Sequence, residues 1–191
     1  MANQNHDVVV IGAGSVGVPA AWAMAKAGMN VLVIDKLASP GQGSNKAAIG
    51  GIRATHSDPA KIRLGLRSLE IATTWQETYG DDIEWSTGGY SFVAYTPREE
   101  KVMKDLLVIQ EPQGLSINWH DAASLLEIIP ALRHDGLIGG TFSPQDGHCS
   151  PLLFGNALYR QAVAAGATFH FNESVQNIET IAGRVSAVVT D

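Results

Sequence analysis

Three glycines near the start of the chain have a spacing that suits a phosphate group. The apolar run Val8 to Ile11 leads directly into Gly12, Gly14 and Gly17. The first glycine permits a sharp turn after a strand, the second removes a side chain that would block a pyrophosphate, and the third lets a helix lie close to the sheet. The first N–H groups of that helix would point at the phosphates. The spacing therefore predicts a dinucleotide-binding loop.

A carboxylate closes the same unit. After a helix-like stretch, a second apolar run from Val31 to Ile34 ends at Asp35, about 20 residues beyond the glycines, as in dinucleotide-binding folds. Asp35 could accept hydrogen bonds from both hydroxyls of an adenosine ribose, which favours a ribose without a phosphate. Glycines at this spacing also occur where a helix only packs tightly. The strand, helix, second strand and acid together favour nucleotide binding.

Composition and charge limit the partners. The chain of 191 residues carries a net charge of −6, so an extended phosphate backbone would be repelled, and nucleic acid is not an expected partner. Apolar residues make up 45% of the chain, yet no apolar run reaches the roughly 20 residues of a membrane span. The polar N-terminus does not resemble a signal peptide, and Cys149 is the single cysteine. These features predict a cytoplasmic protein.

The loop after the second apolar run consists largely of small residues. Gly, Ser and Ala dominate the segment from Leu37 to Gly51. Such side chains leave room for a large flat group against the backbone, although a flexible surface loop has the same composition.

The remaining pattern predicts helices and strands in an order that is not a simple alternation. We expect helices at 15–27, 58–79, 97–110, 121–130 and 151–165, and strands at 83–85, 90–95, 117–119, 137–142, 168–171, 174–181 and 185–189. A hairpin turn is expected at 87–89. An NAD-type domain would alternate strand and helix throughout, so the antiparallel-looking insertion favours a flavin over a nicotinamide.

Three stretches together resemble the FAD-dependent D-amino-acid oxidase superfamily, which includes glycine oxidase, sarcosine oxidase and dye-linked proline dehydrogenase. The first reads D-V-V-V-I-G-A-G-S-V-G and closes with V-I-D-K. The second reads G-S-N-K-A-A-I-G-G-I-R and ends at Arg53. The third reads S-P-Q-D-G-H-C-S-P from Ser143 and is followed by a helix and the strand that holds Val175. Together they are more specific than the glycines alone.

The resemblance implies an α/β fold: an FAD-binding Rossmann-like βαβ domain with an inserted α+β layer of the substrate domain. Residues 1–82 would form the first segment of the FAD-binding domain, 83–142 the inserted part of the substrate domain, and 143–191 an incomplete return segment. Members of the family are usually much longer. We therefore expect a truncated chain, inactive alone, whose C-terminal half is missing or is replaced by a partner subunit.

The resemblance also implies FAD as cofactor and a small amine or amino acid as substrate. In such enzymes the C–H bond beside the nitrogen is oxidised by hydride transfer to the flavin, so a dedicated protein base is not required. The residues implied in cofactor binding are Gly12, Gly14, Ser15, Val16 and Gly17 at the pyrophosphate, Asp35 and Lys36 at the ribose, Ser44 and Asn45 at phosphate or ribitol oxygens, Lys46, Ala47, Ala48, Gly50 and Gly51 along the isoalloxazine, and Val175 at the adenine.

Five further side chains allow more than one interpretation. Arg53 could bind a substrate carboxylate or a flavin phosphate, or form a salt bridge. His56 could lie near an active site or be an ordinary histidine beside a helix. The aromatic residues Tyr90, Phe92 and Tyr95 alternate along a strand and could line a substrate pocket or fill the core.

His148 and Cys149 could suggest covalent flavin attachment or a metal, but a turn is the favoured interpretation. Zinc requires about four ligands, which one cysteine and scattered histidines do not supply. No metal site is expected, and no catalytic residue is assigned.

Three functions remain open at this point. The leading one is an FAD-dependent oxidoreductase acting on CH–NH donors. The second is an NAD-dependent dehydrogenase in which Asp35 holds the NAD ribose. The third is a non-catalytic subunit that binds a nucleotide for stability or assembly.

Overall fold

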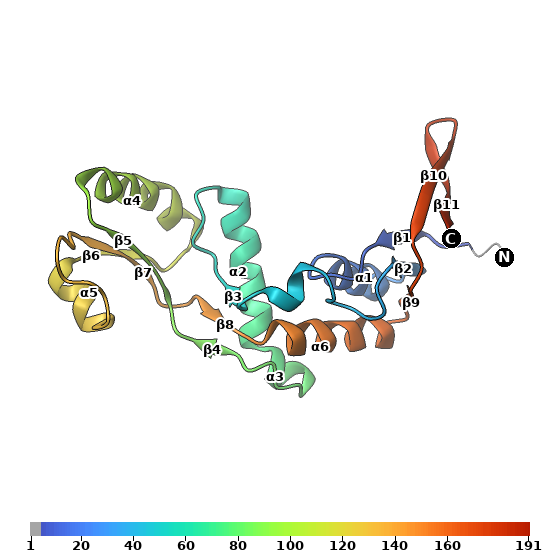
Figure 1. Cartoon of the computed structure of the whole chain (residues 1–191), viewed down its shortest axis with the longest axis horizontal. Coiled ribbons are helices and arrows are strands. Elements are labelled where there is room, and N and C mark those ends of the chain that lie inside the picture. Colours follow the sequence, from blue (N-terminus) through green and yellow to red (C-terminus); the bar gives the residue numbers. More distant parts are fainter. Residues whose placement is uncertain (1–4) are drawn as a thin grey trace. The chain divides into compact units, whose positions relative to one another are not determined.

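The structure is a computed structural model that describes residues 5–191. The chain forms two compact units, Met1–Ile49 with Ser150–Asp191, and Gly50–Cys149. The elements of the first unit are β1 (Val8–Ile11), α1 (Gly17–Lys26), β2 (Val31–Asp35), the 3₁₀ helix η1 (Ser44–Ala47), α6 (Pro151–Ala164), β9 (Thr168–Phe171), β10 (Val175–Ile181) and β11 (Arg184–Thr190) (Figure 1).

The elements of the second unit follow in one continuous stretch. They are β3 (Gly51–Ile52), α2 (Pro59–Thr73), α3 (Trp75–Tyr79), β4 (Ser86–Thr87), β5 (Tyr90–Ala94), α4 (Pro97–Gln110), the 3₁₀ helix η2 (Glu111–Gln113), β6 (Asn118–Asp121), α5 (Ala122–Ile128), β7 (Gly139–Ser143) and β8 (Gly147–His148). The boundaries between the units fall beside Gly50 and Cys149, whereas the sequence suggests 82/83 and 142/143. Because compactness does not reveal what a unit binds, the predicted assignment to FAD and substrate domains stays a prediction.

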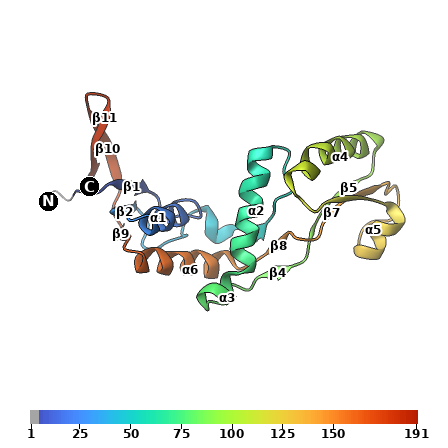
Figure 2. The ribbon, with the colours of Figure 1, turned by 180° about the vertical axis from the view of Figure 1, so that it is seen from behind.

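A parallel sheet forms the centre of the first unit. Its strand order is β1-β2-β9, so β2 is flanked on both sides, and β1 and β9 are the edges. The residues Val31 to Ile34 of β2 are all buried, as expected for the central strand of a parallel sheet. Helices α1 and α6 lie side by side (Figure 1; Figure 2). The predicted βαβ arrangement is therefore confirmed.

A hairpin of β10 and β11 completes the first unit. Its turn uses Ala182 and Gly183, which have φ angles of 51° and 77°. The chain reaches this hairpin through Asn172 and Glu173, whose N–H groups donate to the carbonyls of Leu37 and Asp35 over 3.1 and 3.2 Å. These two hydrogen bonds attach the start of the hairpin to the end of β2.

Two antiparallel sheets organise the second unit, with strand orders β3-β8-β4 and β5-β7-β6. The predicted hairpin at 87–89 is wrong, because β4 pairs with β8 and β5 pairs with β7. Gly89 has a φ of 74°, and its N–H donates to the Asp146 carbonyl over 2.8 Å. The Gly-Gly signal therefore marks the point where the chain passes from one sheet to the next.

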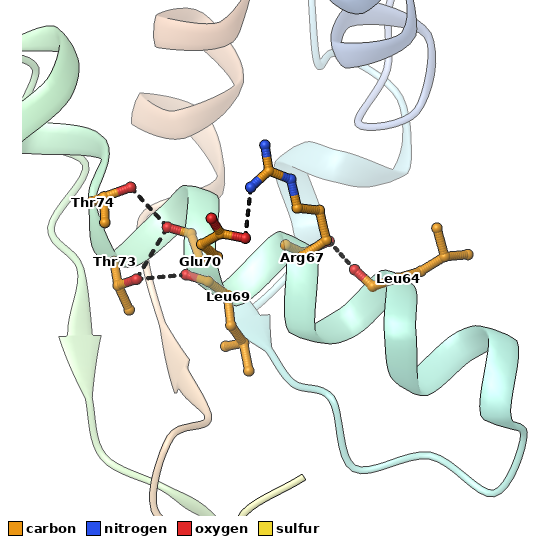
Figure 3. A network of polar contacts seen from close by, with 7 residues as sticks. Leu64, Arg67, Leu69, Glu70, Thr73 and Thr74 are labelled. Atoms are coloured by element: carbon orange, nitrogen blue, oxygen red, sulfur yellow. Dashed lines mark hydrogen bonds and ion pairs between the residues drawn. The ribbon is translucent and has the colours of Figure 1, made fainter. Parts of the chain in front are cut away.

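The predicted helix at 58–79 is interrupted at Thr74, where α2 ends and α3 begins. The hydroxyls of Thr73 and Thr74 donate to the carbonyls of Leu69 and Glu70 over 2.8 Å each (Figure 3). Threonine hydroxyls that bond to the carbonyl four residues earlier compete with the helical pattern and bend helices. The start of α2 agrees with the prediction, since the Asp58 carboxylate accepts a hydrogen bond from the Lys61 N–H and Pro59 follows it.

Helix α2 lies directly on the backbone that follows β3. A Cβ atom on Gly65 would lie 2.7 Å from the Ala54 Cα and 2.8 Å from the Arg53 carbonyl oxygen, closer than real Cβ atoms approach. The buried cluster around this crossing consists of Ala54, Ile62, Leu69, Leu115 and Ile117. Each fully buried leucine or isoleucine contributes about 1.5–3 kcal/mol, so this cluster fixes the segment that carries Arg53.

Candidate functional site

The glycine loop follows β1 directly. Gly12 has a φ of 101°, a conformation that favours glycine, and its N–H donates to the Ile34 carbonyl over 2.8 Å. A Cβ atom on Gly17 would overlap the carbonyl oxygen of Gly12. These two glycines are therefore required by the turn and by the close approach of α1.

Gly14 has neither of these roles. A Cβ atom added there would meet no heavy atom within 4 Å, and the residue does not have a positive φ. A glycine that neither backbone conformation nor packing explains fits the close approach of a pyrophosphate. Ser15 and Val16 beside it are exposed. No side chain caps the start of α1, and its first turn contains no acidic residue, so the helix dipole there favours an anion.

The Asp35 carboxylate is held against the glycine loop. Its Oδ2 atom accepts a hydrogen bond from the Ala13 N–H over 2.6 Å, and its Oδ1 atom accepts one from the Leu37 N–H over 2.8 Å. A carboxylate offers roughly four acceptor positions, so these two bonds orient Asp35 and leave capacity for ribose hydroxyls. The neighbouring Lys36 is exposed.

The small-residue loop returns toward the glycine loop. The Gly41 N–H donates to the Ala13 carbonyl over 2.9 Å. Within η1 the side-chain amide of Asn45 donates to the Pro151 carbonyl over 3.0 Å, which ties the loop to the start of α6. Asn45 therefore has a structural role beside the predicted contact with the cofactor.

The other predicted cofactor residues are divided between the two units. Ser44, Lys46, Ala47 and Ala48 are exposed in the first unit. Val175 opens β10 there, two residues after the Glu173 N–H that donates to the Asp35 carbonyl.

Gly50 and Gly51 belong to the second unit. The Gly50 carbonyl accepts a hydrogen bond from the Cys149 N–H over 3.0 Å, and Gly51 pairs with His148. The structure thus brings the glycine loop, Asp35 and the segment leading to Val175 together within the first unit. The contacts of all these residues with a cofactor stay predictions.

The second unit contains a pocket of about 350 Å³ against α4. Its apolar wall is formed by Phe92 of β5 and by Val102, Met103 and Leu106 of α4. Arg53, Thr55 and His56 contribute its polar side, together with Ser57, Gln110 and Thr141. A pocket that joins an apolar wall to a set of polar groups is typical of small-molecule sites.

Arg53 is held in place by aromatic rings and a carbonyl. Its guanidinium lies 4.9 Å from the ring centre of Tyr90 and 5.3 Å from that of Phe92, distances that suit cation–π attraction. Its Nη1 atom also donates to the Thr55 carbonyl over 3.0 Å. The salt bridges found between residues 5 and 191 do not involve Arg53. Both interpretations of Arg53, as a ligand for an anion and as a partner in a salt bridge, stay predictions.

His56 has an environment that favours the neutral imidazole. Burial lowers its pKa below the ordinary value, and the nearby charges of Arg53 and Lys61 lower it further. Its backbone carbonyl accepts a hydrogen bond from the side-chain amide of the buried Gln110 over 2.9 Å. A backbone hydrogen bond to Arg53 and the carboxylate of Asp146 act on the pKa of His56 in the opposite direction. The cationic side chain of the pocket lining is Arg53.

Asp146 is a central residue that sequence reasoning missed. Its side chain is completely buried and accepts hydrogen bonds from the Ala54 N–H over 2.9 Å and from the Thr55 hydroxyl over 2.5 Å. In the sequence, Asp146-Gly147 has the form of an ordinary turn.

The pocket wall on α4 could be predicted only in part. The apolar residues of α4 recur at helical spacing, which indicates a buried face, but no local pattern indicates which element that face contacts.

Cys149 is buried with 5% of its surface exposed, and burial raises its pKa to about 11. A thiol that stays protonated at neutral pH is a poor nucleophile and a poor metal ligand. Among the residues that the structure describes, no three His, Cys, Asp or Glu side chains cluster as metal ligands. In the same part of the chain, the helices are too short or too polar to cross a bilayer.

Known proteins with similar sequence or structure include several amino-acid oxidoreductases. A D-amino acid dehydrogenase from Rhizobium johnstonii is 24% identical over 238 residues, which cover 96% of this chain and 57% of that protein. The L-proline dehydrogenase from P. horikoshii is 30% identical with a TM-score of 0.90, over 100% of this chain and 50% of that one. Glycine oxidase from Bacillus cereus ATCC 14579 is 25% identical with a TM-score of 0.75, over 97% of this chain and 51% of that one.

The chain thus spans about half the length of these relatives. The predicted α/β fold is confirmed by the structural similarity. The DAO family, described as FAD dependent oxidoreductase, matches residues 7–191. This match confirms the predicted family and its cofactor, FAD, and it favours FAD over the NAD alternative. The chain therefore belongs to the DAO family of FAD-dependent oxidoreductases.

Proposed function

We propose that this chain is the cofactor-binding part of an enzyme that oxidises a small amine or amino acid at its CH–NH bond. Gly14 carries the proposal: neither its conformation nor its packing requires a glycine, whereas an approaching pyrophosphate does. The names of the relatives, D-amino acid dehydrogenase, L-proline dehydrogenase and glycine oxidase, support an amino acid as substrate. The bound flavin would supply hydride acceptance, which no side chain can provide.

The residues of the first unit would bind and orient the cofactor. The uncapped start of α1 and the open space at Gly14 suit the pyrophosphate. Asp35, fixed by Ala13 and Leu37, would accept hydrogen bonds from the adenosine ribose. Further polar contacts with the cofactor would come from Lys36, Ser44 and Asn45. The segment along the isoalloxazine would consist of Lys46 to Ala48 with Gly50 and Gly51. The adenine would contact the backbone of Val175.

Arg53 would bind the carboxylate of the substrate. Its guanidinium is oriented by Tyr90, Phe92 and the Thr55 carbonyl. Arginine and carboxylate form short, charge-assisted hydrogen bonds. The substrate would therefore be an amino acid rather than a simple amine.

The remainder of the catalytic unit would come from further sequence on the same polypeptide or from a partner subunit, since the relatives are about twice as long as the part matched. We propose that residues 83–142 belong to a substrate domain that this remainder completes. We further propose a cytoplasmic location, which the single, buried and reduced Cys149 supports.

Two preparations test the proposed function: the 191-residue chain and the complete gene product, each purified and titrated with FAD and with NADH. We expect both to bind FAD, measured by the change in flavin fluorescence, and only the complete protein to be reduced by amino acids. Tight NADH binding without FAD binding would support the dehydrogenase alternative. FAD that is retained but reduced by no amine, with the complete protein and any partner present, would support the non-catalytic alternative.

A further inference from the structure

Glu173 lies in the short connection between β9 and β10 and contacts three different strands. Its N–H donates to the Asp35 carbonyl at the end of β2 over 3.2 Å. Its carboxylate accepts one hydrogen bond from Nδ1 of His170 in β9 over 3.0 Å and another from the Thr190 hydroxyl of β11 over 2.6 Å. The side chain is partly buried, with 28% of its surface exposed. Glu173 therefore joins the parallel sheet to the hairpin that follows it.

The connection passes through an unusual backbone conformation. Asn172 has a φ of 58°, in the left-handed region that asparagine tolerates better than most residues. The Asn172 N–H donates to the Leu37 carbonyl over 3.1 Å, and the next residue, Glu173, contacts Asp35. The direction in which β10 leaves the sheet is thus set by contacts with the end of β2.

The Thr190 contact lies directly beside Val175. Thr190 is the cross-strand partner of Val175, and the regular pairing of β10 with β11 is interrupted between Val175 and Asn177. A bulge of this kind disrupts the ladder locally. The position of Val175 therefore depends on contacts before the bulge, among them the hydrogen bond from Thr190 to Glu173.

Asp35 links Glu173 to the glycine loop. The Asp35 carbonyl accepts the Glu173 N–H, whereas the Asp35 carboxylate accepts the Ala13 N–H over 2.6 Å. The segments implied at the pyrophosphate, the ribose and the adenine are therefore connected by hydrogen bonds. Both oxygens of the Glu173 carboxylate already have partners in the protein, so Glu173 acts by holding the backbone rather than by contacting the nucleotide.

Adenine and guanine differ in the group at one position of the ring. Adenine carries an amino donor where guanine carries an oxygen acceptor. The backbone offers one N–H donor and one carbonyl acceptor per residue, so a backbone segment that is held in place fits only one of the two bases. A site built to bond a particular group rejects an analogue that lacks this group, provided that the site cannot rearrange.

From these observations we infer that Glu173 is a positioning residue for nucleotide specificity. Held by His170 and Thr190, it fixes the backbone at Val175 so that the site accepts adenine and rejects guanine. The inference rests on the proposed function and adds to it the residue that makes the site selective.

The first test compares ADP with GDP and needs no turnover. The complete gene product and the 191-residue chain, each freed of flavin, are titrated calorimetrically with both nucleotides. We expect ADP to bind at least about tenfold more tightly than GDP. We expect Glu173→Ala to weaken ADP binding until the two affinities lie within about threefold of each other. Equal binding of ADP and GDP by the parent protein would overturn the inference.

Two exposed residues of β10, Glu179 and Thr180, supply matched controls on the same hairpin. Glu179→Ala removes a carboxylate and Thr180→Val removes a hydroxyl, and both should keep the parent ratio of ADP to GDP affinity. Thr190→Val removes the donor to Glu173 and keeps the shape of the side chain, so it should lower the ratio as Glu173→Ala does. Equal ratios in Thr190→Val and Thr180→Val would contradict the inference.

Glu173→Gln distinguishes positioning from a general loss of stability. Its amide keeps an oxygen acceptor for the Thr190 hydroxyl, so this variant should retain most of the preference for ADP. A merely structural role would lower the urea midpoint of Glu173→Ala without changing the ratio of ADP to GDP affinity, and that result would overturn the inference. If Glu173→Ala does not fold, Thr190→Val and Glu173→Gln provide the same comparison.

FAD titration of the same preparations tests the proposed function separately. FAD binding by the parent protein without a preference for ADP over GDP would overturn the inference and leave the proposed function intact. A parent protein that bound neither FAD nor ADP would instead count against the proposed function.

Discussion

The carboxylate of Asp146 accepts a hydrogen bond from the Ala54 N–H over 2.9 Å, although 92 positions separate these residues in the sequence. The same carboxylate accepts a second hydrogen bond from the Thr55 hydroxyl. Asp146 therefore fixes the backbone directly after Arg53, at a point where α2 contacts it from Gly65. The position of Arg53 thus depends on a side chain that is not itself part of the pocket lining but bonds to Thr55, which is.

Replacement of Asp146 by alanine is expected to destabilise the fold strongly. It leaves the buried donors of Ala54 and Thr55 without their acceptor, and each unsatisfied buried donor costs about 1–3 kcal/mol. We expect a loss of about 2–5 kcal/mol in the free energy of unfolding, measured by urea denaturation. Asp146→Asn retains one acceptor oxygen and should lose less.

Asp105 supplies the control for Asp146. It pairs with Lys101 on the surface of α4, where its side chain is 64% exposed, and exposed ion pairs contribute about 0–1 kcal/mol. Asp105→Ala should therefore change stability little. Equal losses for the two alanine variants would mean that the buried hydrogen bonds of Asp146 do not stabilise this segment.

Two helical glycines are expected to respond oppositely to alanine. On helix propensity alone, alanine is favoured over glycine by about 1 kcal/mol. In Gly65→Ala the new Cβ atom would lie 2.7 Å from the Ala54 Cα, so α2 must move away from the Arg53 segment and stability should fall by about 1–3 kcal/mol. In Gly155→Ala the nearest atom is the Asn45 side-chain nitrogen at 3.3 Å, which can shift, so stability should be unchanged or higher. Thermal unfolding of both variants checks the comparison; a stabilised Gly65→Ala would refute the close contact.

Gly14 and Gly17 separate cofactor binding from folding. Gly14→Ala adds a methyl group where no protein atom lies within 4 Å, so we expect unchanged or slightly increased stability and at least tenfold weaker FAD binding. Gly17→Ala would overlap the Gly12 carbonyl and should reduce both stability and FAD binding. Circular dichroism and flavin fluorescence titration measure the two quantities. If Gly14→Ala bound FAD as tightly as the parent chain, the pyrophosphate could not lie over this loop.

Cys149 should react slowly with thiol reagents and show a shifted pH dependence. The thiolate is the reactive form, and burial raises the pKa from 9.0 to about 11 in the folded chain. Because the folded state holds the proton more tightly, this group's contribution to stability is complete below about pH 9 and is lost as the pH rises toward 11. At pH 8 we expect reaction with DTNB at least about 100-fold slower in the native than in the urea-unfolded chain. Equal rates would show that the thiol is accessible.

Local sequence was sufficient for features that depend on short spacings. The turn at Gly12, the presence of helix α1 and the position of Asp35 at the end of β2 all follow from residues within one βαβ unit. The Asp58-Pro59 start of α2 and the Thr96 start of α4 are equally local, since each cap accepts a hydrogen bond from an N–H three residues later.

Features that depend on distant partners could not be predicted in this way. Gly88-Gly89 has the composition of a hairpin turn, but β5 pairs with β7, which lies further along the sequence by about half the length of the second unit. In the sequence Asp146 resembles a turn residue, and its contact with Ala54 exists only because β8 pairs with β3 in the folded chain. The pocket combines α4 with Arg53 and Phe92, and its existence depends on how strands pair rather than on any local pattern.

The edge position of β1 has a practical consequence for handling the protein. β1 forms ladder hydrogen bonds with β2 on one side, and Ile11 at its end is 54% exposed. An open apolar strand edge is a template for pairing with another molecule. Preparations of the 191-residue chain should therefore scatter more light as their concentration rises, and solubility will depend on whatever segment occupies that edge.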